Sequence, residues 1–144
     1  MNLIDNWVFW ALLSAVFAAL TAIFAKVGIA NIDSDFATLI RTVVIVVVLA
    51  GIVAAFGKFQ PLDQIAGKTW LFLILSGLAT GASWLAYFRA LKLGQAAQVA
   101  PVDKLSVVLV AIFGVLFLGE SLTPLGWVGV ALVGTGAVVL AVAG

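Results

Sequence analysis

An aspartate and a lysine stand side by side in an apolar segment, shortly after a proline. The run is Pro101-Val102-Asp103-Lys104. An ionisable side chain at the centre of a membrane span costs about 2.5–3.5 kcal/mol, so it persists where it faces water, pairs with an opposite charge or reaches the interface. Neighbouring helical residues project about 100° apart, so we expect one of the two to face a partner helix and the other an aqueous path. A structural ion pair with Lys26, Arg41 or Arg89 is the alternative.

A stripe of hydroxyl and aromatic side chains lies closer to the N-terminus, at spacings that can place it on one helix face. Its members are Ser76, Thr80, Ser83, Trp84 and Tyr87. The stripe predicts either the wall of a cavity or an interfacial belt of aromatic residues.

Four further charged residues stand near the ends of apolar segments. Lys26, Arg41 and Arg89 can reach the interface with their long side chains, or they can serve a site. Glu120 follows Leu118-Gly119, where a boundary carboxylate can organise the next turn.

The composition excludes several kinds of chemistry. The chain has no histidine and no cysteine, which removes disulfides, thiolate nucleophiles, the usual zinc sites and histidine acid–base catalysis. A net charge of +1 provides no electrostatic footprint for nucleic acid. We therefore expect no cofactor and no metal site. The sequence also gives little support to a membrane enzyme, because it contains no catalytic constellation.

The elements that position these residues must lie in lipid. Of 144 residues, 65% are hydrophobic and 9% are charged, whereas soluble domains have about 45–50% and about 25%. Asp, Glu, Lys and Arg are absent from the windows 6–25, 42–57, 69–88, 105–119 and 121–144. A bilayer core needs roughly 20 helical residues, so we expect one domain, residues 1–144, with spans near 7–28, 36–56, 69–90, 99–118 and 125–142.

All five spans are expected to be helices, because an isolated apolar segment in lipid must satisfy its backbone groups internally. No segment shows the alternating polarity of a membrane barrel, so the predicted fold class is an all-α membrane protein. The Ser and Asp residues of 31–35 can cap the second helix, and Thr123-Pro124 is typical of the start of the fifth.

Several segments together resemble the EamA-type domain of the drug/metabolite transporter superfamily. They are Tyr87-Phe88-Arg89-Ala90-Leu91, Val99-Ala100-Pro101, 116–123 and the glycines from Gly126 to Gly136. The 101–106 segment is similar to the single-domain, five-span bacterial and archaeal branch in particular. Most relatives contain two such domains in inverted orientation, forming a ten-helix inverted repeat, and they export amino acids, related metabolites or drugs, or move nucleotide sugars.

The resemblance also implies a substrate pathway, because the first, third and fourth helices of each half line the central cavity in that fold. The implied residues are Lys26, Ser83, Trp84, Tyr87, Pro101, Asp103 and Lys104, with Arg41, Arg89 and Glu120 as secondary candidates. Asp103 and Lys104 would gate the path or bind polar groups, Trp84 and Tyr87 would shape its apolar wall, and Pro101 would permit bending. Small multidrug resistance relatives instead use a carboxylate in their first span, which is absent here between Asp5 and Asp33.

The predicted function is that of a multi-pass transporter in the cytoplasmic membrane, more an exporter than an importer, with an amino-acid-like small molecule as substrate. A lone five-span unit can form an inverted repeat only with an inverted copy of itself, so a homodimer, antiparallel in the bilayer, is expected. The distribution of basic residues favours one fixed orientation only weakly. Five lie on one side of the predicted membrane and two on the other: Lys26, Arg41, Arg89, Lys92 and Lys104 against Lys58 and Lys68. The alternative is a structural or regulatory membrane subunit that transports nothing.

Overall fold

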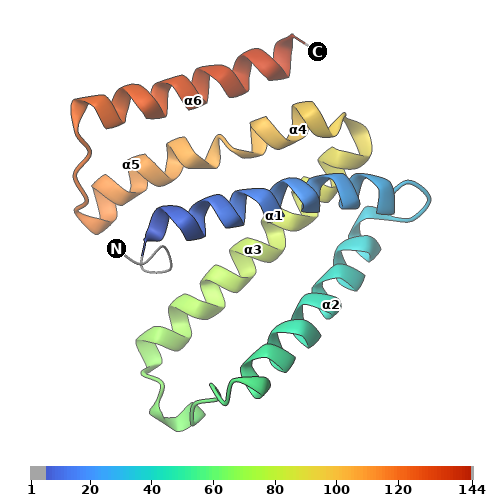
Figure 1. The fold of residues 1–144 in the computed structure, drawn as a ribbon, viewed down its shortest axis with the longest axis vertical. Helices are drawn as coiled ribbons and strands as arrows, with labels where there is room; N and C mark the ends of the chain where they lie inside the picture. Colours follow the sequence, from blue (N-terminus) through green and yellow to red (C-terminus); the bar gives the residue numbers. More distant parts are fainter. Residues whose placement is uncertain (1–5, 144) are drawn as a thin grey trace. The chain divides into compact units, whose positions relative to one another are not determined.

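The computed structural model describes residues 6–143 and contains no strand among them. Five helical segments in this part of the chain are long and apolar enough to cross a membrane, which confirms the all-α prediction (Figure 1). The helices are α1 (Trp7–Gly28), α2 (Ser34–Ala55), α3 (Gly67–Leu93), α4 (Ala96–Asp103), α5 (Ser106–Leu118) and α6 (Pro124–Val142), with a short 3₁₀ helix, η2 (Leu62–Gln64), before α3.

The fourth span consists of two helices, α4 and α5, and begins at Ala96 instead of at residue 99. Between them the backbone N–H of Lys104 donates to the carbonyls of Ala100 (3.3 Å) and Pro101 (3.1 Å), and that of Leu105 donates to Val102 (3.0 Å). Bonds that reach back three residues tighten the turn and often mark a hinge within a helix. The break therefore lies immediately after Asp103.

The chain divides into two compact units, one containing residues up to 25 together with those from 93 onward, and the other containing 26–92. In the first unit α6 packs along both α4 and α5. A Cβ atom placed at Gly134 of α6 would lie 3.2 Å from Val108 Cγ2 of α5. The glycine thus permits the close helix approach that favours association in lipid. By contrast, a Cβ at Gly77 or Gly81 of α3 would meet nothing within 4 Å, so no described residue packs closely against these two glycines.

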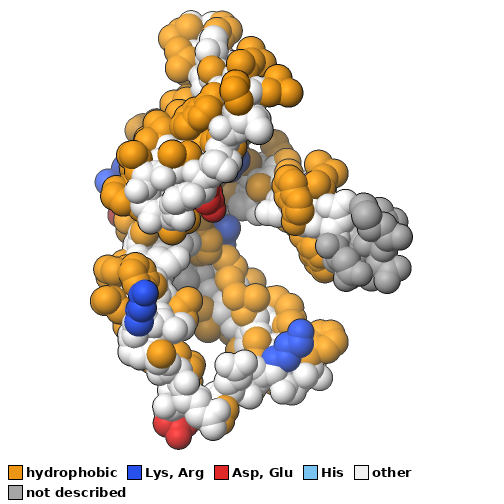
Figure 2. Space-filling model, turned by 90° about the vertical axis from the view of Figure 1, so that its left-hand side faces the viewer, with side chains coloured by type: hydrophobic (Ala, Val, Ile, Leu, Met, Phe, Trp, Pro, Cys, Tyr) orange, Lys and Arg blue, Asp and Glu red, His pale blue; other side chains and the backbone are white. Residues whose placement is uncertain are grey.

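Most apolar side chains point away from the protein. Only 6% to 11% of the residues in each spanning window are buried, and large side chains such as Trp7 (78% exposed) and Leu125 (79%) face outward. Figure 2 shows apolar side chains over most of one face, with few charges among them. Exposed apolar area on this scale has no counterpart in soluble monomers, so the surrounding medium of these helices is lipid.

The start of α6 provides a stability prediction. The Thr123 side-chain oxygen accepts a hydrogen bond from the Gly126 N–H at 3.1 Å, and Pro124 occupies the first helical position, which confirms the predicted start signal. Thr123→Ala should lower the free energy of unfolding by about 1 kcal/mol, because one helix-end N–H loses its partner. Thr123→Ser is the matched control and should stay within about 0.5 kcal/mol of the wild type. Equal losses in chemical unfolding of the detergent-solubilised variants would contradict the capping role.

Candidate functional site

Asp103 and Lys104 form an ion pair with each other at the break between α4 and α5. Lys104 Nζ lies 3.0 Å from Asp103 Oδ2. The expectation that the two side chains point in different directions is therefore wrong. The helix ends at Asp103, so the 100° separation of a regular helix is not continued beyond it, and the flexible lysine side chain can fold back.

The pair is accessible from outside the protein. The Lys104 side chain is 55% exposed and that of Asp103 is 32% exposed, while Pro101 is half-buried. Two opposite charges in contact reduce the cost of placing either one within a membrane span. Both charges therefore stand beside the one interruption that the described spans contain.

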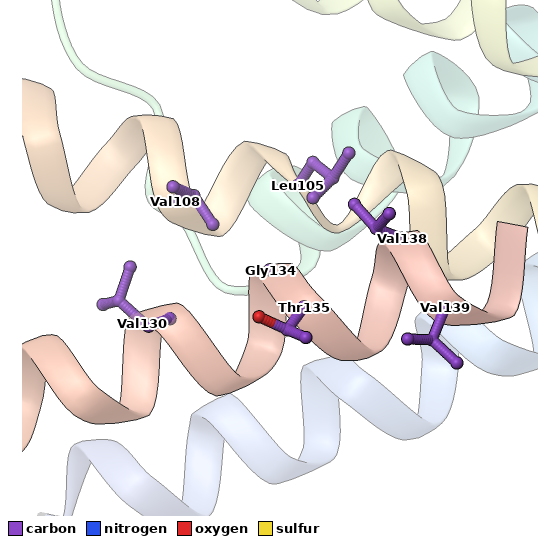
Figure 3. Close-up of a pocket in the computed structure, with 8 residues that line it drawn as sticks. Leu105, Val108, Val130, Gly134, Thr135, Val138 and Val139 are labelled. Atoms are coloured by element: carbon purple, nitrogen blue, oxygen red, sulfur yellow. The ribbon is translucent and has the colours of Figure 1, made fainter. Parts of the chain in front are cut away.

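An apolar groove adjoins this break on the α6 side (Figure 3). It has a volume of about 450 Å³. Thr135 supplies the only polar side chain of its lining, which consists of Leu105, Val108, Val130, Ala131, Gly134, Thr135, Val138 and Val139. Sequence analysis missed this groove, because small and β-branched residues in α6 are equally typical of ordinary helix packing.

Lys26, in the last turn of α1, contacts the C-terminal end of α3 through its side chain. Its Nζ donates a hydrogen bond of 2.5 Å to the carbonyl of Leu91, a residue with no exposed surface. The last four carbonyls of a helix have no partner within the helix, and a cation there also interacts favourably with the helix dipole. Lys26 thus stabilises a buried helix end, and its place on a substrate pathway stays a prediction.

Two further contacts join the same end of α3 to the first turn of α2 and to the segment before it. Arg89 Nη2 donates to both carboxylate oxygens of Asp35, at 2.8 and 3.1 Å, and Lys92 Nζ donates to the carbonyl of Ile32. The Arg89–Asp35 pair is well exposed, so its contribution to stability is small. Several basic residues on this side therefore have structural contacts, which weakens their value as orientation signals.

Asp33 caps α2, as predicted for this turn. Its carboxylate accepts hydrogen bonds from the N–H groups of Asp35 (2.9 Å) and Phe36 (3.0 Å). The hydrogen bonds from Phe36 and Asp35, assisted by the positive charges of Lys92 and Arg89, lower the pKa of the Asp33 carboxyl below its usual value of 3.8.

A lowered pKa makes the cap pH-dependent. The ionised cap stabilises the fold above pH 3.8, and this stabilisation is lost as the pH falls through the lower pKa of the folded state. Asp33→Ala should therefore lower the midpoint of thermal unfolding at pH 7, and the difference from wild type should narrow below pH 3.8. Asp33→Asn, which retains a capping oxygen, is the control and should lose less at pH 7. A pH-independent difference for Asp33→Ala would contradict this role.

Arg41 lies on α2 against two aromatic rings of α3. The centre of its guanidinium is 4.1 Å from the ring centroid of Trp84 and 5.4 Å from that of Phe88. Such cation–π contacts are most favourable with tryptophan. Its Nη1 is buried and has no hydrogen-bond partner among the residues described. Tyr87 packs edge-on to Phe88 at 6.5 Å, while Ser83 is exposed.

Glu120 lies at the end of α5, where Gly119 adopts a left-handed conformation (φ 68°). The Glu120 N–H donates to the Gly114 carbonyl at 3.1 Å, and the Gly119 N–H donates to the same carbonyl. A Cβ at Gly114 would lie 2.5 Å from Glu120 Oε2, so the carboxylate folds back over this glycine. Glu120 therefore organises the end of α5, in line with the boundary role expected for it.

The predicted pathway residues fall into both units. Trp84 lies with Arg41 in the unit 26–92, which also holds Lys26, Ser83 and Tyr87, whereas the unit containing α4 to α6 holds Pro101, Asp103 and Lys104. Sequence analysis missed Phe88 as a partner of Arg41 and Asp35 as a partner of Arg89. The four-residue spacing of Trp84 and Phe88, which places both rings on one face of a helix, could have indicated that Arg41 contacts Phe88 as well as Trp84.

Comparison with known proteins supports a transporter. The profile of the EamA-like transporter family matches residues 5–142. The chain is 72% identical over 138 residues to a protein named "Uncharacterized transporter in cobO 3'region" from Sinorhizobium sp, and the match covers 96% of this chain and 98% of the relative. No solved structure matches. These similarities and the five spans point to a multi-pass membrane transporter rather than to an enzyme. The chain belongs to the EamA-like transporter family.

Proposed function

We propose that the protein exports small amino-acid-like compounds across the cytoplasmic membrane by alternating access. The observation that carries the proposal is the interrupted fourth span, which has the Asp103–Lys104 pair at its break. In many transporters a discontinuous helix forms the substrate site. At this break the backbone stays hydrogen-bonded, and the polar groups that it presents are the side chains of Asp103 and Lys104. Membership of a transporter family supports the same conclusion.

In this mechanism the ion pair is the gate. Asp103 and Lys104 hold each other in the resting state, and the ammonium group of an amino-acid-like substrate competes with Lys104 for Asp103. Pro101 has no backbone N–H to donate, so α4 can bend at lower cost. Trp84 and Tyr87 of α3 would line an apolar part of the substrate pathway.

The assembly proposed is an antiparallel homodimer. Five spans place the two ends of a chain on opposite sides of the bilayer, so a second copy inserted upside down completes an inverted repeat. A reporter fused to the C-terminus tests this: dual insertion requires signals from both sides. A signal from one side alone would replace the antiparallel dimer with a parallel dimer or a heteromeric partner.

The transport proposal is tested by ligand binding followed by flux. Purified protein in liposomes is heated with a panel of amino acids, nucleotide sugars and lipophilic cations, because a ligand that binds only the folded state raises its unfolding temperature. Compounds that stabilise the protein are then measured by counterflow. A stabilising amino acid that is also exchanged supports the proposal. Absence of any stabilising compound, or wild-type flux in Asp103→Asn and Lys104→Gln, would overturn it in favour of a non-transporting membrane subunit.

A further inference from the structure

Arg41 has a charge that its surroundings do not neutralise. Neither ion pair among the described residues includes it, and its Nη1 is buried without a hydrogen-bond partner. Leaving a charged donor buried and unsatisfied is costly. Apart from the two ring contacts, the described residues of the unit 26–92 therefore give this guanidinium neither an ion pair nor a hydrogen bond to Nη1.

The nearby carboxylates are engaged elsewhere. Asp35 accepts both hydrogen bonds from Arg89, and Asp33 accepts the two N–H groups at the start of α2. The hydroxyls of Thr38 and Thr42, on the same helix as Arg41, donate to backbone carbonyls one turn before them.

The Arg41 guanidinium lies too deep along the helices for its position to be explained by a side chain that reaches toward the membrane–water interface. Arg41 is six residues beyond Asp35 on α2, and Trp84 is five residues before Arg89 on α3. At 1.5 Å per residue, these separations are about 9 Å and about 7.5 Å of helix. The guanidinium lies closer to the deeper ring of Trp84 than to Phe88, which is adjacent to Arg89. It is thus held below the exposed Arg89–Asp35 pair.

The shape of the guanidinium also suits a carboxylate. Its N–H groups lie in one plane, where they can form a fork with a planar oxyanion, and the ring contacts hold the cation beside Trp84. One positive charge matches one negative charge, and the two nearest cations on α3 have other contacts, Arg89 with Asp35 and Lys92 with the Ile32 carbonyl. A monoanionic carboxylate therefore fits better than a phosphate dianion.

We propose that Arg41, held against Trp84 and Phe88, is a binding site for the carboxylate of the transported substrate. This inference rests on the proposed transport function and names a chemical group that the substrate must carry. It assigns to Trp84 the role of orienting the arginine, in addition to shaping an apolar wall.

The site can be tested without knowing the substrate, because Trp84 reports on the guanidinium beside it. The chain has five tryptophans, and the four others, Trp7, Trp10, Trp70 and Trp127, are replaced by phenylalanine. Acetate then replaces chloride at constant ionic strength, while the emission of Trp84 is recorded. Acetamide, the neutral analogue of acetate, is the ligand control and inorganic phosphate is the third probe. If the four-site variant does not fold, the same titration is made on the wild type and on Trp84→Phe, and the difference between them gives the response of Trp84.

The expected result is a saturable change in emission with acetate and none with acetamide. Arg41→Gln should raise the half-saturating acetate concentration about tenfold or more, as expected for loss of a charge-assisted hydrogen bond. The matched control Arg89→Gln, on the same helix as Trp84, should leave the acetate response unchanged.

Three results would overturn the inference: no saturable acetate response, an equal response to acetamide, or tighter binding of phosphate than of acetate. A failure of the transport proposal would give a different result: no substrate flux would be measured, but the emission of Trp84 would still respond to acetate. Conversely, an amino acid and its amide transported equally well would refute the carboxylate site and leave transport intact.

Discussion

Asp103→Cys is expected to react rapidly with a charged, membrane-impermeant thiosulfonate, although position 103 lies within the fourth span. The chain has no cysteine of its own, so each introduced thiol reports one position. Water at the break between α4 and α5 would allow the thiol to ionise to the reactive thiolate, and it would let the charged reagent reach that thiolate. The rate of labelling in intact membranes is the measurement.

Val110→Cys is the matched control, because Val110 belongs to the same span and is 66% exposed, yet lies among apolar residues of α5. A charge at the bilayer centre costs about 2.5–3.5 kcal/mol, so its labelling should be slower by about a hundredfold. A compound that stabilises the protein should also protect position 103. If the cysteine at position 103 reacts as slowly as the one at position 110, no aqueous path reaches the ion pair, and the gating mechanism would fail.

Lys26→Met should lower the free energy of unfolding by about 1–3 kcal/mol, because it removes the charged donor from a buried carbonyl. That carbonyl belongs to Leu91, whose surface is fully covered, in the last turn of α3. Methionine retains most of the side-chain volume, so the loss reports the hydrogen bond more than the packing. Titration of the detergent-solubilised protein with a denaturing detergent provides the measurement.

Lys92→Met is the control for this prediction, since Lys92 also donates to a backbone carbonyl, that of Ile32, but at an exposed position. Water can replace the lost donor there, and the expected change is within about 0.5 kcal/mol. Equal destabilisation by the two substitutions would show that burial of the Leu91 end does not determine the effect of Lys26.

The number of spans and two helix starts could be predicted from the sequence because they depend on local chemistry. Gaps between charged residues locate lipid-compatible segments, and the side chains of Asp33 and Thr123 bond to N–H groups only two or three residues away. The largest errors in the helix bounds concern the turn between α3 and α4, since α3 ends at Leu93 and not at 90. Arg89 and Lys92 lie inside α3, and only Gly94 and Gln95 separate it from α4, so the charged residues do not mark the helix end.

The site was less predictable, because its contacts join residues far apart in the chain. Lys26 and the Leu91 carbonyl are separated by 65 positions, and Arg89 and Asp35 by 54. Nothing in the local pattern distinguishes a lysine that reaches the interface from one that caps a distant helix end. The position of the break was also missed: Pro101 indicated a weakened turn before it, whereas the interruption follows Asp103, where backbone bonding shifts to three-residue steps.

The groove beside α6 shows which part of the fourth span has room to move. α4 already packs along α6, and Val108 of α5 lies against α6 at Gly134. Leu105, at the break itself, borders a volume of about 450 Å³ whose lining includes no residue of α4. Bending at the break would therefore move the junction between α4 and α5 into this volume, while both helices keep their contacts with α6. A bulkier residue at Ala131 would fill the volume and restrict that movement, and both charges of the ion pair would stay in place.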